Sequence, residues 1–198
     1  MNFCYALNFS KFSNIFNDNI DVTKYILDKV PDNRKKNKHL FYAQPTDIFK
    51  ESFLKLLPVD VSVCHYFYKT SGGGIHVDIP QYDPNNPEDM WGINWNFGEP
   101  GIYEFWDYSD ITSVSEFVNE ESRTHPVLTT NRMPRKSYRH KTGPILFNAS
   151  FPHRVVLSNS LPKFSVSLRM APPVISWKDA ISKFSNFIID DTNILESI

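Results

Sequence analysis

The chain has 198 residues, of which 41% are hydrophobic and 22% charged, and its formal net charge is -1. These values are close to globular averages, so they predict one folded domain over residues 1–198 and exclude a disordered or fibrous chain. The near-neutral charge gives no general attraction to nucleic acid or to a membrane surface. We therefore expect any polyanionic partner to be held by a local patch.

The cysteine count and the N-terminal sequence indicate the cellular compartment. Cys4 and Cys64 are too few for a disulfide framework or a thiolate metal site, so a reducing compartment is expected. The first residues lack the basic and apolar regions of a signal peptide, and no stretch reaches the roughly 18 apolar residues of a membrane span. We expect a soluble, cytoplasmic protein without a membrane partner.

Two N-terminal segments show the spacing of amphipathic helices. In residues 10–30 and 46–57 the apolar side chains recur at intervals of three and four, with Asp21 and Thr46 as expected caps. We interpret the basic stretch between these segments as a solvated turn. Residues 1–58 are thus predicted to form a helical support for the rest of the domain.

From residue 59 to residue 174 the pattern changes to short β-type runs separated by turn residues. The runs typical of strands are residues 61–68, 75–79, 92–97, 102–108, 144–149, 153–158 and 164–170. No helix long enough for a crossover lies between them, so they predict an antiparallel sandwich or jelly roll, a mainly β fold with flanking helices. Residues 175–198 return to helical spacing, with Ser176 as the expected cap.

One of these runs carries a potential metal site. His76 and Asp78 are two residues apart, and in a strand this spacing places both side chains on the same face. His153, which follows a proline at the start of a later strand, is the best third ligand. Two imidazoles and one carboxylate on one side of a metal leave positions open, as in Fe(II) oxygenases. We predict His76, Asp78 and His153 as metal ligands and catalytic residues.

Three stretches resemble a known family. They are YFYKTSGGGIHVD, WGINWNFGEPGIYEFWDY and GPILFNASFPHRVVLSNSLPKFSVSLRM. Over residues 61–170 the chain resembles the 2-oxoglutarate and Fe(II)-dependent oxygenases, in particular the prolyl-hydroxylase-like members and the small versions carried by bacteriophages. The resemblance implies a double-stranded β-helix, a cupin-like barrel, with the site at its open end. It also implies Fe(II), 2-oxoglutarate and O2 at the site, release of succinate, and ascorbate as a reductant.

The resemblance implies a second set of residues that holds the co-substrate. Relatives carry an arginine and a serine after the second histidine, and Lys163 and Ser165 occupy these positions here. Lys163 supplies the charge but not the bidentate fork of arginine, so the identity of the keto acid stays open. Tyr66 matches by position a tyrosine that contacts the co-substrate carboxylate in prolyl-hydroxylase-like relatives. Asn94 is a further candidate donor.

Residues 163–170 alternate between a polar and an apolar face. The polar face carries Lys163, Ser165, Ser167 and Arg169. We expect this face to line a ligand cavity and the apolar face to pack against the helices. A hairpin about residues 159–160 would assign Lys163 to the distal carboxylate of 2-oxoglutarate and Arg169 to the near carboxylate or the substrate. The same spacing of the two cations resembles that of oxygenases that dealkylate nucleic acid.

The substrate and two alternative functions stay open at this point. The basic segment 131–141 is interpreted as a solvated loop, so a nucleic-acid substrate is possible but not favoured over a small molecule or a peptide. One alternative is a cupin-like metal enzyme without 2-oxoglutarate. The other is a non-catalytic jelly-roll binding protein or virion component. The sequence does not predict an oligomeric state.

Overall fold

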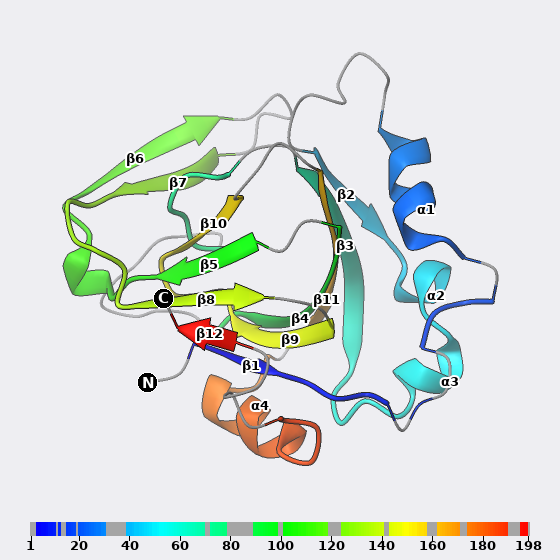
Figure 1. Cartoon of the computed structure of the whole chain (residues 1–198). Helices are drawn as coiled ribbons and strands as arrows, with labels where there is room; N and C mark the ends of the chain where they lie inside the picture. Colours follow the sequence, from blue (N-terminus) through cyan, green and yellow to red (C-terminus); the bar gives the residue numbers. More distant parts are fainter. Residues whose placement is uncertain are drawn as a thin grey trace.

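The structure is a computed structural model and shows a mainly β protein with short helices on one side (Figure 1). It describes residues 3–10, 12, 15–18, 20–30, 39–69, 72–78, 89–98, 101–118, 124–140, 143–157, 162–170, 174–189 and 195–197. No helix within these ranges is long and apolar enough to cross a membrane.

A six-stranded antiparallel sheet forms the centre of the molecule, in the order β1-β9-β4-β11-β3-β2. Its strands are β1 (Cys4–Ala6), β2 (His39–Ala43), β3 (Val61–Lys69), β4 (Trp91–Gly98), β9 (Gly143–Asn148) and β11 (Lys163–Met170). β11 pairs along its length with β3 on one side and β4 on the other. Its position is therefore fixed from both edges.

A four-stranded sheet, in the order β10-β5-β8-β12, lies against part of the large sheet. Its strands are β5 (Gly101–Phe105), β8 (Lys136–His140), β10 (His153–Leu157) and β12 (Leu195–Ser197), while β6 (Ser113–Val118) and β7 (Thr124–Thr129) form a separate ribbon. One apolar cluster joins Phe105, Tyr138 and Val155 of the small sheet to Ile145 and Phe147 of β9. The two sheets thus face each other across a shared core.

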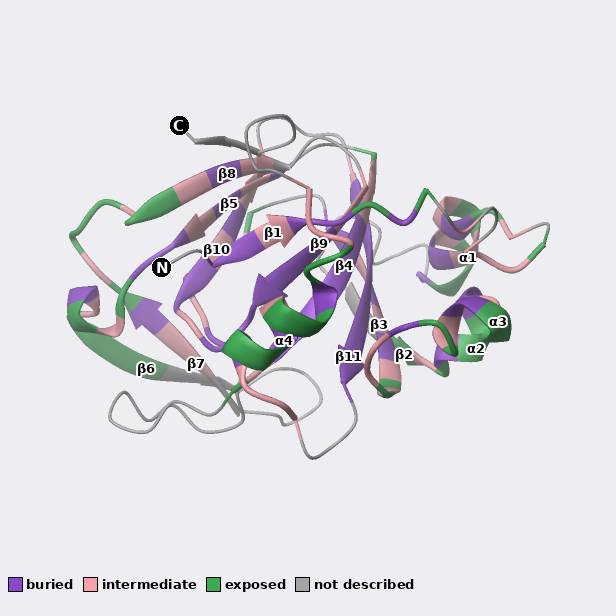
Figure 2. Ribbon diagram, turned by 90° about the horizontal axis from the view of Figure 1, so that it is seen from below, coloured by how far each residue is buried: buried purple, intermediate pink, exposed green. Residues whose placement is uncertain are grey.

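The alternation of β11 separates two environments. Phe164, Val166 and Leu168 belong to the main apolar cluster, together with helix residues such as Ile26 and Phe184. Burying each such side chain stabilises the fold by roughly 1.5–3 kcal/mol. All eight residues of β11 are buried, as the continuous purple strand in Figure 2 shows. The prediction that the apolar face packs against the helices is confirmed, and the polar face is enclosed rather than open to water.

The N-terminal helices are shorter than predicted. They are α1 (Val22–Lys29), α2 (Pro45–Ile48) and α3 (Glu51–Leu54). α1 begins where Asp21 caps it, because the Asp21 carboxylate accepts a hydrogen bond from the Lys24 amide at 3.0 Å. The predicted second helix is divided because Phe49 forms a β-bridge with Phe16, and its cap is Gln44 rather than Thr46.

Both terminal regions also contribute strands that were not predicted. β1 and β2 lie within residues 1–58, so this region is part of the large sheet and not only a helical support. α4 (Trp177–Phe184) begins at the predicted cap, where Ser176 Oγ accepts from the Asp179 amide at 3.1 Å. The helix ends well before residue 198, and β12 pairs with β8.

The structure corrects three expectations for the β region. Residues 75–79 were predicted as a strand, but Ile75 and His76 form only isolated bridges, to Leu128 and His153. The hairpin between residues 153 and 170 does not form, because β10 pairs with β5 while β11 lies in the other sheet. The loop interpretation of residues 131–141 is also corrected, since β8 occupies Lys136–His140.

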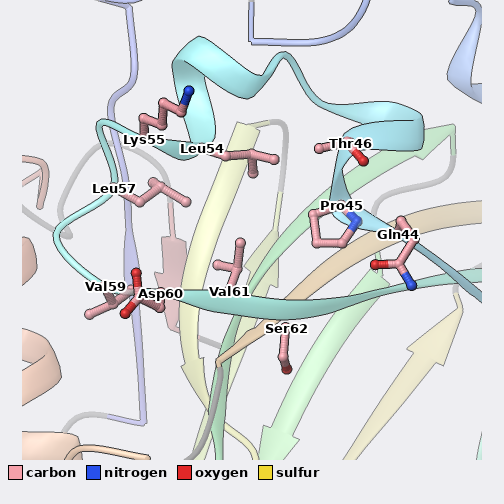
Figure 3. A pocket seen from close by; sticks show the side chains of 10 residues that line it. All are labelled: Gln44, Pro45, Thr46, Leu54, Lys55, Leu57, Val59, Asp60, Val61 and Ser62. Atoms are coloured by element: carbon pink, nitrogen blue, oxygen red, sulfur yellow. The ribbon is translucent and has the colours of Figure 1, made fainter.

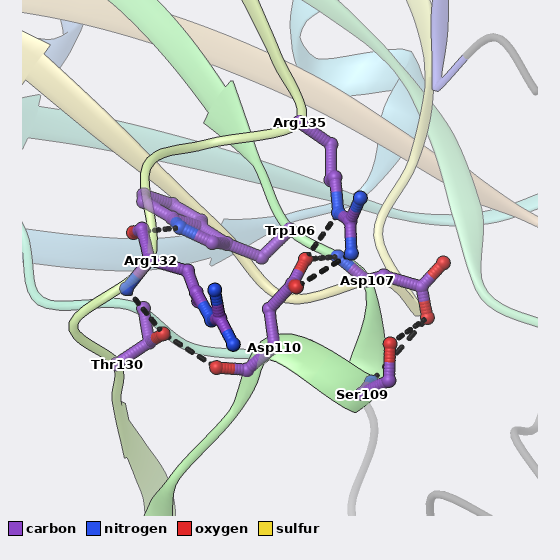
Figure 4. A network of polar contacts seen from close by, with 7 residues as sticks. All are labelled: Trp106, Asp107, Ser109, Asp110, Thr130, Arg132 and Arg135. Atoms are coloured by element: carbon purple, nitrogen blue, oxygen red, sulfur yellow. Dashed lines mark hydrogen bonds and ion pairs between the residues drawn. The ribbon is translucent and has the colours of Figure 1, made fainter.

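A polar network connects the segment after β5 to the segment before β8 (Figure 4). Arg135 donates two hydrogen bonds to the buried carboxylate of Asp110, at 2.6 and 2.7 Å. Trp106 Nε1 donates to the carbonyl of Arg132 at 3.0 Å, and the Trp106 amide donates to the carbonyl of Pro152 at 2.9 Å. Part of the basic segment therefore braces the chain next to His153.

The Asp110–Arg135 pair predicts an acid-dependent loss of stability. Hydrogen bonds from Arg135 lower the pKa of Asp110, and a carboxylate with a lowered folded-state pKa stabilises the fold above its ordinary pKa and loses this effect as the pH falls through the lowered value. We expect Arg135→Met to reduce the melting temperature at neutral pH, with a gap to the parent that shrinks below about pH 4. Thermal unfolding followed by circular dichroism tests this, and a pH-independent gap contradicts it.

Candidate metal centre

Backbone hydrogen bonds bring His76 and His153 together. The amide of each residue donates to the carbonyl of the other, both at 2.9 Å. His153 begins β10, and His76 follows the glycines at 72–74, so two distant segments meet at this bridge. The imidazole centres lie 4.5 Å apart. The two rings are thus placed side by side by the main chain.

The orientation of both imidazoles is fixed through Nδ1. The Nδ1 atom of His76 lies 2.9 Å from the carbonyl of Gly74, and that of His153 lies 2.8 Å from the carbonyl of Phe151. A carbonyl oxygen only accepts, so Nδ1 carries the proton and Nε2 keeps its lone pair. Metal-binding histidines commonly donate their other ring N–H in this way. Both rings therefore present Nε2 as a ligand atom.

Asp78 completes the cluster. Ligand atoms of His76, Asp78 and His153 all lie within 4.8 Å of one another. The Asp78 amide donates to the carbonyl of Ala149 at 3.0 Å, and Asp78 Oδ2 accepts from Arg169 Nη2 at 2.6 Å. Asp78 Oδ1 lies 3.5 Å from His76 Nε2. Arg169 thus orients one carboxylate oxygen and leaves the other toward the imidazoles.

The charges of this cluster fit a divalent cation such as Fe(II). Burial lowers the pKa of His153, although the charge of Asp78 acts against it, and a neutral imidazole is what a metal requires. Burial alone would raise the pKa of Asp78, but the charge of Arg169 and its hydrogen bond to the carboxylate hold this pKa well below its ordinary range. Two imidazole nitrogens and one carboxylate oxygen form the ligand set of the facial triad.

Lys163 and Ser165 belong to a buried polar network deeper between the sheets. Lys163 Nζ donates to Tyr103 Oη at 3.2 Å and lies 4.4 Å from the centre of the tyrosine ring. Tyr103 and Ser165 both donate to Asn96 Oδ1, at 3.0 and 2.7 Å. Burial and the charge of Lys69 lower the pKa of Lys163 well below its ordinary value. The structure therefore gives the candidate anchor an enclosed setting.

Asn94 and Arg169 lie on the same face, with polar atoms left unsatisfied. Asn94 is opposite Ser167 in the β4–β11 register. Among the described residues, Asn94 Oδ1, Ser167 Oγ, and Arg169 Nε and Nη1 have no hydrogen-bond partner. Leaving buried polar groups unpaired costs about 1–3 kcal/mol each, more for charged ones. Such groups beside a metal-ligand cluster indicate a place where a polar molecule binds.

The structure places Tyr66 away from the site. Tyr66 is opposite Val166 on the apolar face of the sheet, and its ring centre lies 5.6 Å from that of Tyr25. Burial raises its pKa to about 12. The structure therefore places Tyr66 on the opposite face of the sheet from Lys163 and Arg169.

Three residues that the sequence analysis did not select share the polar interior: Lys69, Asn96 and Tyr103. Tyr103 places its hydroxyl in this interior, where it donates to Asn96 Oδ1 and accepts from Lys163 Nζ. Its only sequence signal is the alternation of residues 101–105, which also fits a core position. The position of Lys69 opposite Lys163 depends on the register of strands far apart in the chain.

A surface hollow elsewhere has no comparable chemistry. It lies between the α2–α3 segment and the start of β3 (Figure 3). Lys55 and Asp60 are its only ionisable lining residues, and none of the metal-site residues reaches it. We assign it no function.

Comparison with known proteins gives only weak structural likeness. No family model and no curated protein matches the chain. Vicilin from Corylus avellana (hazelnut) is 16% identical over 73% of this chain and 32% of its own, with a TM-score of 0.39. The Escherichia coli ribosomal oxygenase YcfD is 13% identical over 78% and 40%, with a TM-score of 0.38. A 2OG-Fe(II) oxygenase family oxidoreductase from Burkholderia pseudomallei is 14% identical over 56% and 43%, with a TM-score of 0.27.

This chain thus spans less than half the length of each of these solved structures. At such TM-scores the likenesses carry no argument about the site.

We predict that His76→Ala, Asp78→Ala and His153→Ala each weaken Co(II) binding by more than about 100-fold, because each removes one of three ligands. The fold should persist, since these side chains bury little apolar surface. Anaerobic Co(II) titration followed by visible absorption measures binding, and circular dichroism checks the fold. His65→Ala serves as a control that removes an imidazole outside the cluster. Parental affinity in all three variants would show that these residues do not form the site.

Proposed function

We propose that the protein is a non-haem Fe(II)- and 2-oxoglutarate-dependent dioxygenase. It hydroxylates a small-molecule or peptide substrate and converts 2-oxoglutarate to succinate and CO2. The observation that carries the proposal is one buried polar face that joins two features. At one end Arg169 orients the metal ligand Asp78, and at the other the amino group of Lys163 is enclosed beside Tyr103.

The strand order supports a double-stranded β-helix as the scaffold. β3, β4, β9 and β11 are neighbours in the large sheet, and β5, β8 and β10 in the small one. The bridge at residues 75–76 adds a further segment beside β10. Along the chain these segments cross repeatedly between the two sheets, as the strands of a jelly roll do. His153 then lies at the start of β10, and His76 and Asp78 lie in the 75–78 segment beside it.

The residues of the chain have distinct roles in this proposal. His76, Asp78 and His153 hold Fe(II), which when bound supplies the activation of O2. Arg169 holds Asp78 and directs two further N–H groups into the interior. Lys163 binds the distal carboxylate of 2-oxoglutarate, with Tyr103 and Ser165 fixing its surroundings. The two sheets exclude water from this region, which strengthens each of these polar contacts.

Succinate formation tests the function. Purified protein with Fe(II), ascorbate and O2 should slowly convert labelled 2-oxoglutarate to succinate even without substrate, and the Asp78→Ala variant should not. Nuclear magnetic resonance of the labelled acid measures both. Tight metal binding without succinate would exclude the proposed activity and leave a cupin-like metal enzyme without 2-oxoglutarate.

Lys163→Ala should weaken 2-oxoglutarate binding by roughly 30-fold or more, because it removes a charge-assisted contact worth about 2–5 kcal/mol. Since Lys163 has a lowered pKa, the affinity of the parent should also fall as the pH rises through that value, when the ammonium is lost. The affinity of the alanine variant should lack this dependence. Arg169→Ala should weaken metal or substrate binding more than co-substrate binding. Anaerobic calorimetric titrations compare the variants, and the reverse order would exchange the two roles.

A further inference from the structure

Lys69 is a further basic residue in the polar interior, beside Lys163 and Arg169 of β11. It ends β3, directly opposite Lys163 in the register of β3 and β11, so both side chains lie on the same face of the large sheet. Both residues are buried, with exposures of 8% for Lys69 and 2% for Lys163. Two lysines thus lie side by side between the sheets.

The charge of Lys69 acts on both His153 and Lys163. Burial is the main cause of the lowered pKa of both His153 and Lys163, and the charge of Lys69 contributes to each. The ammonium of Lys69 is therefore within electrostatic reach of the metal centre and of the candidate anchor.

Like charges directly opposite each other in a sheet are destabilising, and burial increases the effect. An anion held between the two ammonium groups would offset this repulsion. Lys163 Nζ has three donor hydrogens, and Tyr103 Oη is its only hydrogen-bond partner among the described residues. Lys163 thus has N–H groups available to donate to an oxyanion.

Glycines give the two ammonium groups their room. A Cβ at Gly101 would lie 2.8 Å from Lys163 Nζ, and a Cβ at Gly73 would lie 3.6 Å from Lys69 Nζ. Gly98, which pairs with Lys163, has a φ of 79°, a conformation that favours glycine. A side chain at Gly101 would displace the amino group of Lys163, so the absence of a side chain at residue 101 leaves space for this group.

We propose that Lys69 and Lys163 together form a two-lysine clamp for the distal carboxylate of the bound oxoacid, with Lys69 as a specificity-determining residue. This inference rests on the proposed function and deepens it. One ammonium binds each carboxylate oxygen. The clamp selects a dicarboxylic oxoacid over an oxoacid with an apolar end.

A pair of ligands isolates the contribution of Lys69 to binding of the distal carboxylate. 2-Oxoglutarate and 2-oxopentanoate differ only in that a methyl group replaces the distal carboxylate. Each is titrated anaerobically into the Co(II)-loaded parent, Lys69→Met, and the control Lys55→Met, whose exposed lysine lies on the helix side. Methionine keeps the aliphatic stem and removes the charge. Calorimetry gives the affinities, and thermal unfolding confirms that each variant is folded.

We expect Lys69→Met to weaken 2-oxoglutarate binding by about 10-fold or more and to leave 2-oxopentanoate binding unchanged. Lys55→Met should bind both acids as the parent does. Equal weakening of both acids, or of neither, would overturn the clamp while the parent's 2-oxoglutarate binding still supports the proposed function. A Co(II)-loaded parent that binds neither acid would instead overturn the proposed function, and the clamp with it. If Lys69→Met does not fold, Lys69→Gln replaces it with the same expected outcome.

Discussion

The two-faced burial of β11 is the constraint on which the rest of the structure depends. The strand lies between β3 and β4, so its backbone is hydrogen-bonded on both edges. This pairing fixes the face of the sheet on which each of its side chains lies. One face joins the apolar cluster under the helices. The other carries Lys163, Ser165, Ser167 and Arg169 into the space between the sheets. A slip by one residue would exchange these faces and place charges in the apolar core.

The candidate metal centre is assembled around this strand from segments that do not belong to it. The main chain brings His76 and His153 together, and Arg169 of β11 connects Asp78 to the interior. Each contact uses a different element of the fold. The position of the cluster is therefore a property of the packing of the two sheets, and not of any single loop.

The parts of this arrangement that could be predicted are those with a local signal. The His76–Asp78 spacing placed both side chains on one side, and the alternation of residues 163–170 separated the polar from the apolar face. The hairpin expected after His153 failed because strand pairing is non-local, and residues 153–157 pair with β5 instead. The apolar surroundings of Tyr66 were not evident for a related reason, since its face depends on the register with Val166. Lys69 and Tyr103 have no local signal that distinguishes them from core or surface residues.

The main-chain bridge between His76 and His153 has a consequence for metal selectivity. Both imidazoles are already oriented by backbone carbonyls, so no ion is needed to build the site. A rigid, preformed set of two nitrogens and one oxygen discriminates poorly among first-row divalent metals, whose affinities then follow the Irving–Williams order. Copper and nickel would outcompete iron at equal concentration. A metal bound at this cluster would then be selected by which ions are available in the cell.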